Sequence, residues 1–202
     1  MTPRPPAAAY LNPCKSIDST NVDVARVAMD LRGVDTFATI DACFRFVRDE
    51  VQHSGDYRRN PVTCSASQVL LHRTGYCYAK SHLLCALLRA NGVPAGLCYQ
   101  RLCIDDHGPP CCLHGLNAVW LPDTGWFRLD PRGNKAGIDA RFEPPAERLA
   151  FIPRLSGERD LPGVFARPLR QVVAALERHD SWDALLANLP DGEWDKYSLP
   201  ND

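Results

Sequence analysis

Apolar residues recur at helical spacing through the first half of the chain. Five of them lie three or four positions apart: Phe37, Ile40, Phe44, Val47 and Val51. Residues at this spacing share one face of a helix, so the pattern predicts a helix whose apolar face packs into the core.

A second helix is indicated near residue 65. Ser65 is followed three positions later by Gln68, the spacing of a capping box, in which both side chains bind free backbone groups at a helix start. The apolar run at 69–71 follows, and Gly75 is the expected end of this helix.

The third predicted helix begins at about Cys77 and ends at Asn91-Gly92, residue types that tolerate the left-handed conformation at a helix end. Four leucines mark its apolar face: Leu83, Leu84, Leu87 and Leu88. Cys85 lies among them, and we interpret it as a core residue.

After Pro94 the pattern becomes that of strands: AGLCYQRLCI, GLNAVWL and WFRLD. The stretch DDHGPPCC is expected to be a connecting loop and PDTG a turn, while PLRQVVAALERH and SWDALLANL predict two closing helices within 165–190. Helices, then an antiparallel sheet, then helices indicate the α+β class. We expect a single domain over 1–202, with 1–15 as an extended N-terminal arm.

The balance of charged residues limits the classes of partner that we expect. Lys plus Arg number 23 and Asp plus Glu 24, giving a net charge of -1 and a pI near 6.6, which favours neither a nucleic-acid nor a membrane partner. The start lacks the pattern of a signal peptide and no stretch has the length of a membrane span, so we expect a cytoplasmic protein.

Cysteine is abundant. The nine residues are Cys14, Cys43, Cys64, Cys77, Cys85, Cys98, Cys103, Cys111 and Cys112. Their odd number and the expected compartment argue against disulfides. The candidate ligands between Cys98 and His114 lack the two paired half-sites of structural zinc, so we expect neither a metal nor a cofactor.

Cys77 stands where a thiol is most easily activated. A helix start stabilises a thiolate through its free N–H groups and the helix dipole. An imidazole could take the thiol proton and later give it to the leaving group, and a carboxylate could orient the imidazole. His114 and Asp130 lie at the same end of the predicted hairpin and are the candidates for these two roles.

The strand register decides whether the pair can meet. If Trp120 pairs with Trp126, Asp130 falls opposite Leu116 and on the same face as His114, within side-chain reach. If Leu121 pairs with Trp126 instead, Asp130 points to the other face. The catalytic interpretation therefore predicts the first register, or a bulge that restores it, and we expect the two tryptophans to be a cross-strand pair.

These motifs resemble the transglutaminase-like superfamily: GYCYAKSHLLCALLRANGVPAG, then HGLNAVWL, then GWFRLDPRGN, over about residues 60–135. The resemblance implies a papain-like fold and a triad of Cys77 as nucleophile, His114 as base and acid, and Asp130 as orienter. It also implies a thioester formed on an amide carbonyl of a peptide, protein or small amide, resolved by water or an amine. Family members often carry an acidic residue where this chain has Tyr76, and its length resembles that of the short prokaryotic members, without calcium sites.

An oxyanion hole needs two donors. The backbone N–H of Cys77 is the expected first donor, and His53, Gln68 and Gln100 are unranked candidates for the second. His72 and His82 are expected on helix surfaces, and adjacent Cys111 and Cys112 are expected to be part of a connector, because neighbouring cysteines rarely have disulfide geometry.

Two other function classes stay open. The first is a binding or scaffold domain that keeps the fold without turnover, and the second is a cysteine-rich metal protein. The sequence leaves the substrate and the oligomeric state undetermined.

Overall fold

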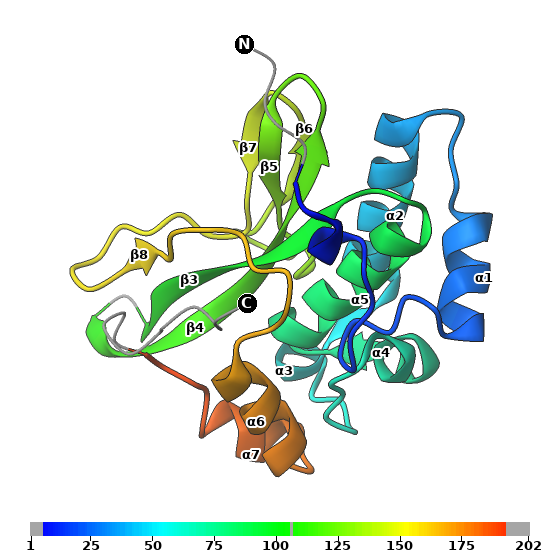
Figure 1. The fold of residues 1–202 in the computed structure, drawn as a ribbon. Helices are drawn as coiled ribbons and strands as arrows, with labels where there is room; N and C mark the ends of the chain where they lie inside the picture. Colours follow the sequence, from blue (N-terminus) through cyan, green and yellow to red (C-terminus); the bar gives the residue numbers. More distant parts are fainter. Residues whose placement is uncertain (1–5, 106, 193–202) are drawn as a thin grey trace.

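The computed structural model describes residues 6–105 and 107–192 (Figure 1). A short 3-10 helix, Ala8–Tyr10, comes first. The α-helices that follow are α1 Val22–Asp30, α2 Thr36–Glu50, α3 Ser54–Tyr57, α4 Ala66–His72, α5 Cys77–Ala90, α6 Arg170–Arg178 and α7 Trp182–Leu186.

In the described ranges the strands form three sheets. Their bounds are β1 Gln52–His53, β2 Thr74–Gly75, β3 Ala95–Asp105, β4 Gly108–Leu121, β5 Gly125–Leu129, β6 Arg141–Glu143, β7 Ala146–Arg148 and β8 Arg159–Asp160. The main sheet is antiparallel in the order β5-β4-β3-β8, whereas β1 and β2 pair in parallel and β6 and β7 form a separate hairpin.

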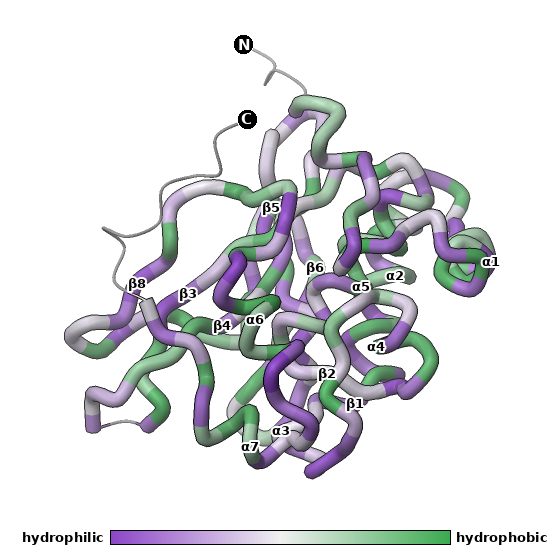
Figure 2. Tube along the Cα trace, turned by 60° about the horizontal axis from the view of Figure 1, so that its bottom comes forward, coloured by the Kyte–Doolittle hydropathy of each residue, from purple (hydrophilic) through white to green (hydrophobic). Residues whose placement is uncertain are grey.

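Helix α5 lies at the centre of the fold, between the sheet and helices α1, α2 and α4 (Figure 1). Every residue from Cys77 to Arg89 is buried. The outer helices are amphipathic: hydrophobic and hydrophilic residues alternate along α1 and α6 (Figure 2), and each buries one apolar stripe. The predicted central helix and its leucine face are thus confirmed.

The two faces of the main sheet have different roles. One face, including Leu97, Tyr99 and Val119, belongs to the large core shared with α5. The other carries the small cluster of Cys98, Leu116 and Ala118, covered by later segments of the chain. The fold is α+β and papain-like, as the sequence predicted.

The hairpin register is the one that the catalytic interpretation required. Trp120 pairs with Trp126, and their rings meet edge to face with centroids 5.6 Å apart. Asn117 pairs with Leu129, so Asp130 follows the last paired residue of β5 and lies across from Leu116.

Several local predictions were wrong. Most of the stretch predicted as the loop DDHGPPCC is strand: β3 runs to Asp105 and β4 begins at Gly108, with a shift in register before Cys103 pairs with Cys111. Phe37 is 49% exposed and does not belong to the core. Helical spacing places Phe37 at the end of the apolar stripe, where its ring packs on Phe142 at 6.2 Å instead.

The ends of the chain partly match expectation. The capping box of Ser65 and Gln68 and both closing helices are present. The helix after Ser65 ends at His72, three residues before Gly75. The arm predicted over 1–15 is not extended throughout, since it contains the 3-10 helix, and residues 1–5 lie outside the described part of the chain. Within the described ranges, the helices are too short or too polar to cross a membrane.

The approach of α5 to β4 depends on Gly115. A Cβ atom there would lie 3.0 Å from a ring carbon of Tyr78 and 3.2 Å from the Tyr78 Cα, which is backbone and cannot turn away. We therefore expect Gly115→Ala to lower the free energy of unfolding by about 1–3 kcal/mol, measured by urea denaturation. Gly55→Ala is the matched control, because its nearest contacts would be 3.4 Å away; equal effects in the two variants would contradict the close-approach argument.

Candidate active site

Cys77 is the first residue of α5. The cap residue Tyr76 provides no side-chain hydrogen bond to the helix start, and the first backbone N–H groups of a helix have no partner within it. The positive end of the helix and these free donors therefore surround the Cys77 thiol. This placement confirms the predicted helix start.

The thiol occupies the free edge of β4. Strand β5 ends at Leu129, opposite Asn117, so within the described part of the chain β4 has no strand neighbour on that side from residue 116 toward its start. Along this stretch the N–H of Leu113 donates to the carbonyl of Pro190, and the N–H of Gly115 points to Cys77 Sγ at 3.5 Å. The Cys77 sulfur thus occupies the position that a backbone carbonyl oxygen would take if another strand paired with β4 here.

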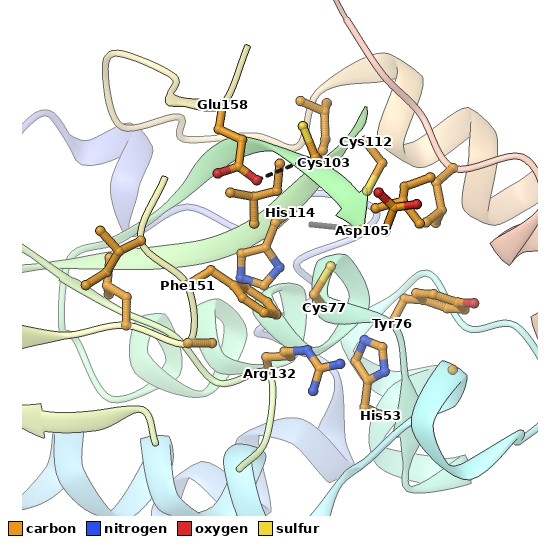
Figure 3. A pocket seen from close by; sticks show the side chains of 18 of the residues that line it. His53, Tyr76, Cys77, Cys103, Asp105, Cys112, His114, Arg132, Phe151 and Glu158 are labelled. Carbon is orange, nitrogen blue, oxygen red and sulfur yellow. Dashed lines mark hydrogen bonds between the residues drawn. The ribbon is translucent and has the colours of Figure 1, made fainter. Parts of the chain in front are cut away.

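His114 and Asp130 meet as the register predicts. His114 Nε2 lies 2.7 Å from Asp130 Oδ2, and both side chains are buried. With Nε2 committed to the carboxylate, Nδ1 is the ring nitrogen left for Cys77. The edge of the imidazole packs on the Phe151 ring, with centroids 5.0 Å apart, which fixes the ring plane (Figure 3).

Asp130 is fully buried, yet its hydrogen-bond partners keep it ionised. Burial alone would raise its pKa, but the charge and hydrogen bond of His114 lower it, as do the backbone N–H groups of Arg132 and Ala150. Those N–H groups donate to Oδ1 at 3.1 Å and to Oδ2 at 3.2 Å. The net effect is a lowered pKa for the Asp130 carboxyl.

Pairing with Asp130 also changes the pKa of the His114 imidazole. Burial lowers the pKa of its imidazole, but the charges of Asp130 and Cys77, with hydrogen bonds to both, raise the pKa to about 10. An imidazole with that pKa is protonated at neutral pH. Its cationic ring lies beside the Cys77 side chain, with which it also forms a hydrogen bond.

A second ion-pair group borders the site. The Arg132 guanidinium donates to both oxygens of Asp56 at 2.7 and 3.0 Å, and Lys135 binds the same carboxylate at 2.7 Å. Arg132 also lies over the Phe151 ring, 5.5 Å from its centroid. Because its backbone N–H binds Asp130, Arg132 connects the two carboxylates.

The three candidates for the second oxyanion donor differ in whether they line the cleft. His53 lines the cleft beside Cys77 and contacts the Tyr76 ring (Figure 3). Gln68 does not line the cleft, and its side chain caps α4. Gln100 pairs with His114 across the strands, but its amide N–H binds Asp160, and it does not line the cleft either. Of the three candidates, His53 is thus the one that lines the cleft.

His53 is a neutral ring. Burial lowers its pKa well below the ordinary value, and the positive charge of Arg132 lowers it further. Its Nδ1 is buried without a hydrogen-bond partner in the described structure, although Asp56 Oδ2 lies 3.8 Å away. A neutral imidazole keeps one N–H for a ligand.

His72, His82 and Cys85 lie outside the cleft. His72 is exposed, as expected. His82 was expected on a helix surface and is instead fully buried, because α5 is covered on all sides; its Nδ1 lies 2.7 Å from the Cys64 carbonyl, and burial lowers its pKa to about 4. Cys85 is a core residue, and burial raises its pKa to about 11.

Sequence patterns missed several residues of the site. Asp56 lies 76 positions from Arg132, and Phe151 belongs to a segment without periodicity. Lys80 was also missed: it is one turn from Cys77, fully buried, and donates to the carbonyls of Arg48 and Val51. Burial lowers its pKa to about 7, assisted by the charge of Arg132. Only Arg132, directly after Asp130-Pro131, could have been suspected from the motif.

The site opens into a cleft of about 1380 Å³. Its walls come from the start of α5, the outer ends of β3 and β4, the segment around 149–158, and α7 (Figure 3). Among the described residues, no group of three or more His, Cys, Asp or Glu side chains has the arrangement of a metal site.

A model of the transglutaminase-like superfamily matches residues 26–131, just over half of the 202 residues. The chain belongs to the transglutaminase-like superfamily. The matched region contains all three of Cys77, His114 and Asp130. No curated protein matches the chain.

Solved structures share the fold of the superfamily. A candidate cysteine protease from Cytophaga hutchinsonii is 19% identical, with a TM-score of 0.50 over 61% of this chain and 40% of that one. The periplasmic domain of TgpA from Pseudomonas aeruginosa is 21% identical, with a TM-score of 0.45 over 60% and 45%. Red sea bream transglutaminase is 14% identical, with a TM-score of 0.40 over 54% and 26%. The chain thus spans less than half the length of each.

The buried ion pair predicts a pH-dependent contribution to stability. The raised pKa of His114 adds stability that is complete below about pH 6.5 and is lost as pH rises toward 10, while the lowered pKa of Asp130 adds stability that is lost in acid. Asp130→Asn should therefore cost on the order of 3 kcal/mol near pH 6 and much less near pH 10, measured by urea denaturation at each pH.

Asp123→Asn makes the same chemical change on an exposed turn and serves as the control. It should leave the stability nearly unchanged at every pH. A loss in Asp130→Asn that is equally large at pH 6 and pH 10 would show that the carboxylate stabilises the fold without pairing with a charged His114.

Proposed function

We propose that this protein is a cysteine-dependent amide hydrolase or acyltransferase that acts through a thioester on Cys77. The observation that carries the proposal is the placement of Cys77 at the start of α5, beside an imidazole that a buried carboxylate orients. Membership of the superfamily supports it.

In the proposed first half-reaction, Cys77 Sγ attacks the carbonyl carbon of an amide, and any proton on the thiol passes to His114. The negative charge on the carbonyl oxygen is stabilised by the free N–H of Cys77 and by a second donor, for which we propose His53. Collapse of the tetrahedral intermediate breaks the C–N bond, and His114 gives its proton to the leaving amine. An acyl group remains on sulfur.

In the second half-reaction, water or an amine attacks the thioester carbonyl and transfers a proton to His114. The C–S bond breaks, and the product is a carboxylic acid or a new amide. Asp130 accepts a hydrogen bond from His114 throughout and keeps Nδ1 directed at sulfur. The two outcomes differ only in the acceptor.

The cleft favours a peptide or protein donor over a small amide. Its volume of about 1380 Å³ exceeds the range typical of small-molecule pockets. Three exposed apolar side chains border it: Ile104, Ile152 and Leu186, which are 52%, 74% and 44% exposed. We expect these to contact apolar side chains of the substrate.

The first test measures the reactivity of Cys77. We expect iodoacetamide to alkylate Cys77 at pH 6–7 at least tenfold faster than the other cysteines, with mass spectrometry resolving each site, because a thiolate is the reacting species. His114→Ala should remove most of this advantage. Equal rates at Cys77 in the parent and in His114→Ala would contradict an activated pair and favour a scaffold domain.

The second part of the test follows turnover. A library of peptide amides is screened with and without primary amines, and Cys77→Ala and Cys77→Ser are expected to lose at least 10³-fold in rate with unchanged thermal midpoints. Cys14→Ser is the matched control, since Cys14 does not line the cleft. Turnover that survives in Cys77→Ala would exclude the proposed nucleophile.

The role of His53 has its own test. His53→Leu removes the ring N–H and should lower kcat by about 10²-fold with little change in KM, the effect of losing one oxyanion donor. His53→Gln keeps an N–H donor and should recover part of the loss. A change in KM alone would indicate that His53 contacts the ground-state substrate and not the oxyanion.

A further inference from the structure

Two cysteines that the catalytic proposal does not use lie side by side at the outer end of the β3–β4 hairpin. Cys103 of β3 is paired directly with Cys111 of β4, and their sulfur atoms are 3.0 Å apart. The pair lies one position away from Cys112 along β4, which alternates to the opposite face of the hairpin.

The backbone at this pair has the arrangement in which side chains approach most closely. The Cys103 N–H donates to Glu158 Oε1, outside the β3–β4 ladder, at 2.9 Å. Leu97 and Tyr99, which share the parity of Cys103, likewise bond outward, to Phe165 and Leu161. Cys103 and Cys111 therefore form a non-hydrogen-bonded pair, whose Cα atoms are about 4.5 Å apart in antiparallel sheets, within the range of disulfides.

We propose that Cys103 and Cys111 form a reversible disulfide across the hairpin. The oxidant is of the small-disulfide class, such as oxidised glutathione. One thiolate attacks a sulfur of the small disulfide, forms a mixed disulfide and releases one small thiol. The second cysteine then attacks the protein sulfur of the mixed disulfide and releases the other small thiol, so two electrons and two protons pass to the oxidant.

The bond would fix one wall of the cleft, which Cys103 itself lines. Leu102 and Cys112, the neighbours of the pair in the chain, also line the cleft, from the opposite face of the hairpin, the face that carries His114. Glu158, which binds the Cys103 N–H, also accepts hydrogen bonds from the N–H groups of Arg154 and Leu155. The bond therefore holds together the hairpin end to which the segment 154–158 is attached.

The sequence did not indicate that Cys103 and Cys111 are neighbours. Adjacent Cys111 and Cys112 have poor disulfide geometry, and Cys103 is eight positions from Cys111 with no motif to connect them. Because DDHGPPCC was expected to be a loop, no strand pairing brought Cys103 to Cys111. In the structure, the β3–β4 pairing continues to this point and places Cys103 opposite Cys111.

The test equilibrates the full chain, as Cys77→Ala so that no activated thiol can exchange disulfides, with mixtures of reduced and oxidised glutathione. Free thiols are then alkylated, the chain is cleaved before Asp105, and the fragments are identified by mass spectrometry. We expect the fragment containing Cys103 to be linked to the one containing Cys111 and Cys112, with Cys112 alkylated. The link should disappear in Cys111→Ser and persist in Cys112→Ser.

A thermal measurement gives a second readout. Closing a loop of this length should raise the unfolding midpoint of the oxidised chain by about 5 °C over the reduced chain, and Cys103→Ser should show no such difference. Alkylation of both Cys103 and Cys111 in the most oxidising mixture, or a link from Cys112, would overturn the proposal. Neither result bears on the thioester chemistry of Cys77, which this experiment does not measure.

Discussion

The placement of the candidate site depends on one contact, that of the start of α5 with the edge of β4 at Gly115. The Gly115 N–H meets Cys77 Sγ, and the missing side chain at this position lets the Tyr78 backbone approach the strand. Because α5 is buried along its length, the surrounding helices and the sheet hold it from every side. The position of the thiol is therefore set by the whole core and not by a loop.

The end of β5 creates the space for this contact. If β5 continued past Leu129, a backbone carbonyl would satisfy the Gly115 N–H and the thiol would be excluded from the edge. Instead the chain leaves the sheet at Asp130-Pro131, and proline cannot supply the N–H of a further ladder bond. The residue at which the ladder stops is the one that binds His114. Sheet termination and assembly of the His114–Asp130 pair are thus the same structural event.

The sequence could predict the parts of this arrangement that depend on local interactions. The helix starting at Cys77 and the capping box at Ser65 were predictable, because spacing of three or four residues carries them. The pairing of Trp120 with Trp126 was one of two registers that the sequence allowed, and only the requirement that His114 meet Asp130 selected it. The partners of Asp56 and the ring that packs on His114 were not predictable, since they come from distant segments without periodicity. His82 was misplaced because a polar residue on a helix covered on all sides leaves no signal in amphipathic spacing.

Charge balance connects the site with the rest of the core. His114 and Arg132 bring positive charge to the cleft that Cys77 lines, and each is paired with a carboxylate, His114 with Asp130 and Arg132 with Asp56. Asp56 is bound by both Arg132 and Lys135, so the Arg132 charge is neutralised locally and is not free to bind a substrate carboxylate. His114 is likewise paired, with Asp130, through Nε2. Because both cations are already paired with carboxylates, neither offers a free positive charge to an anionic group.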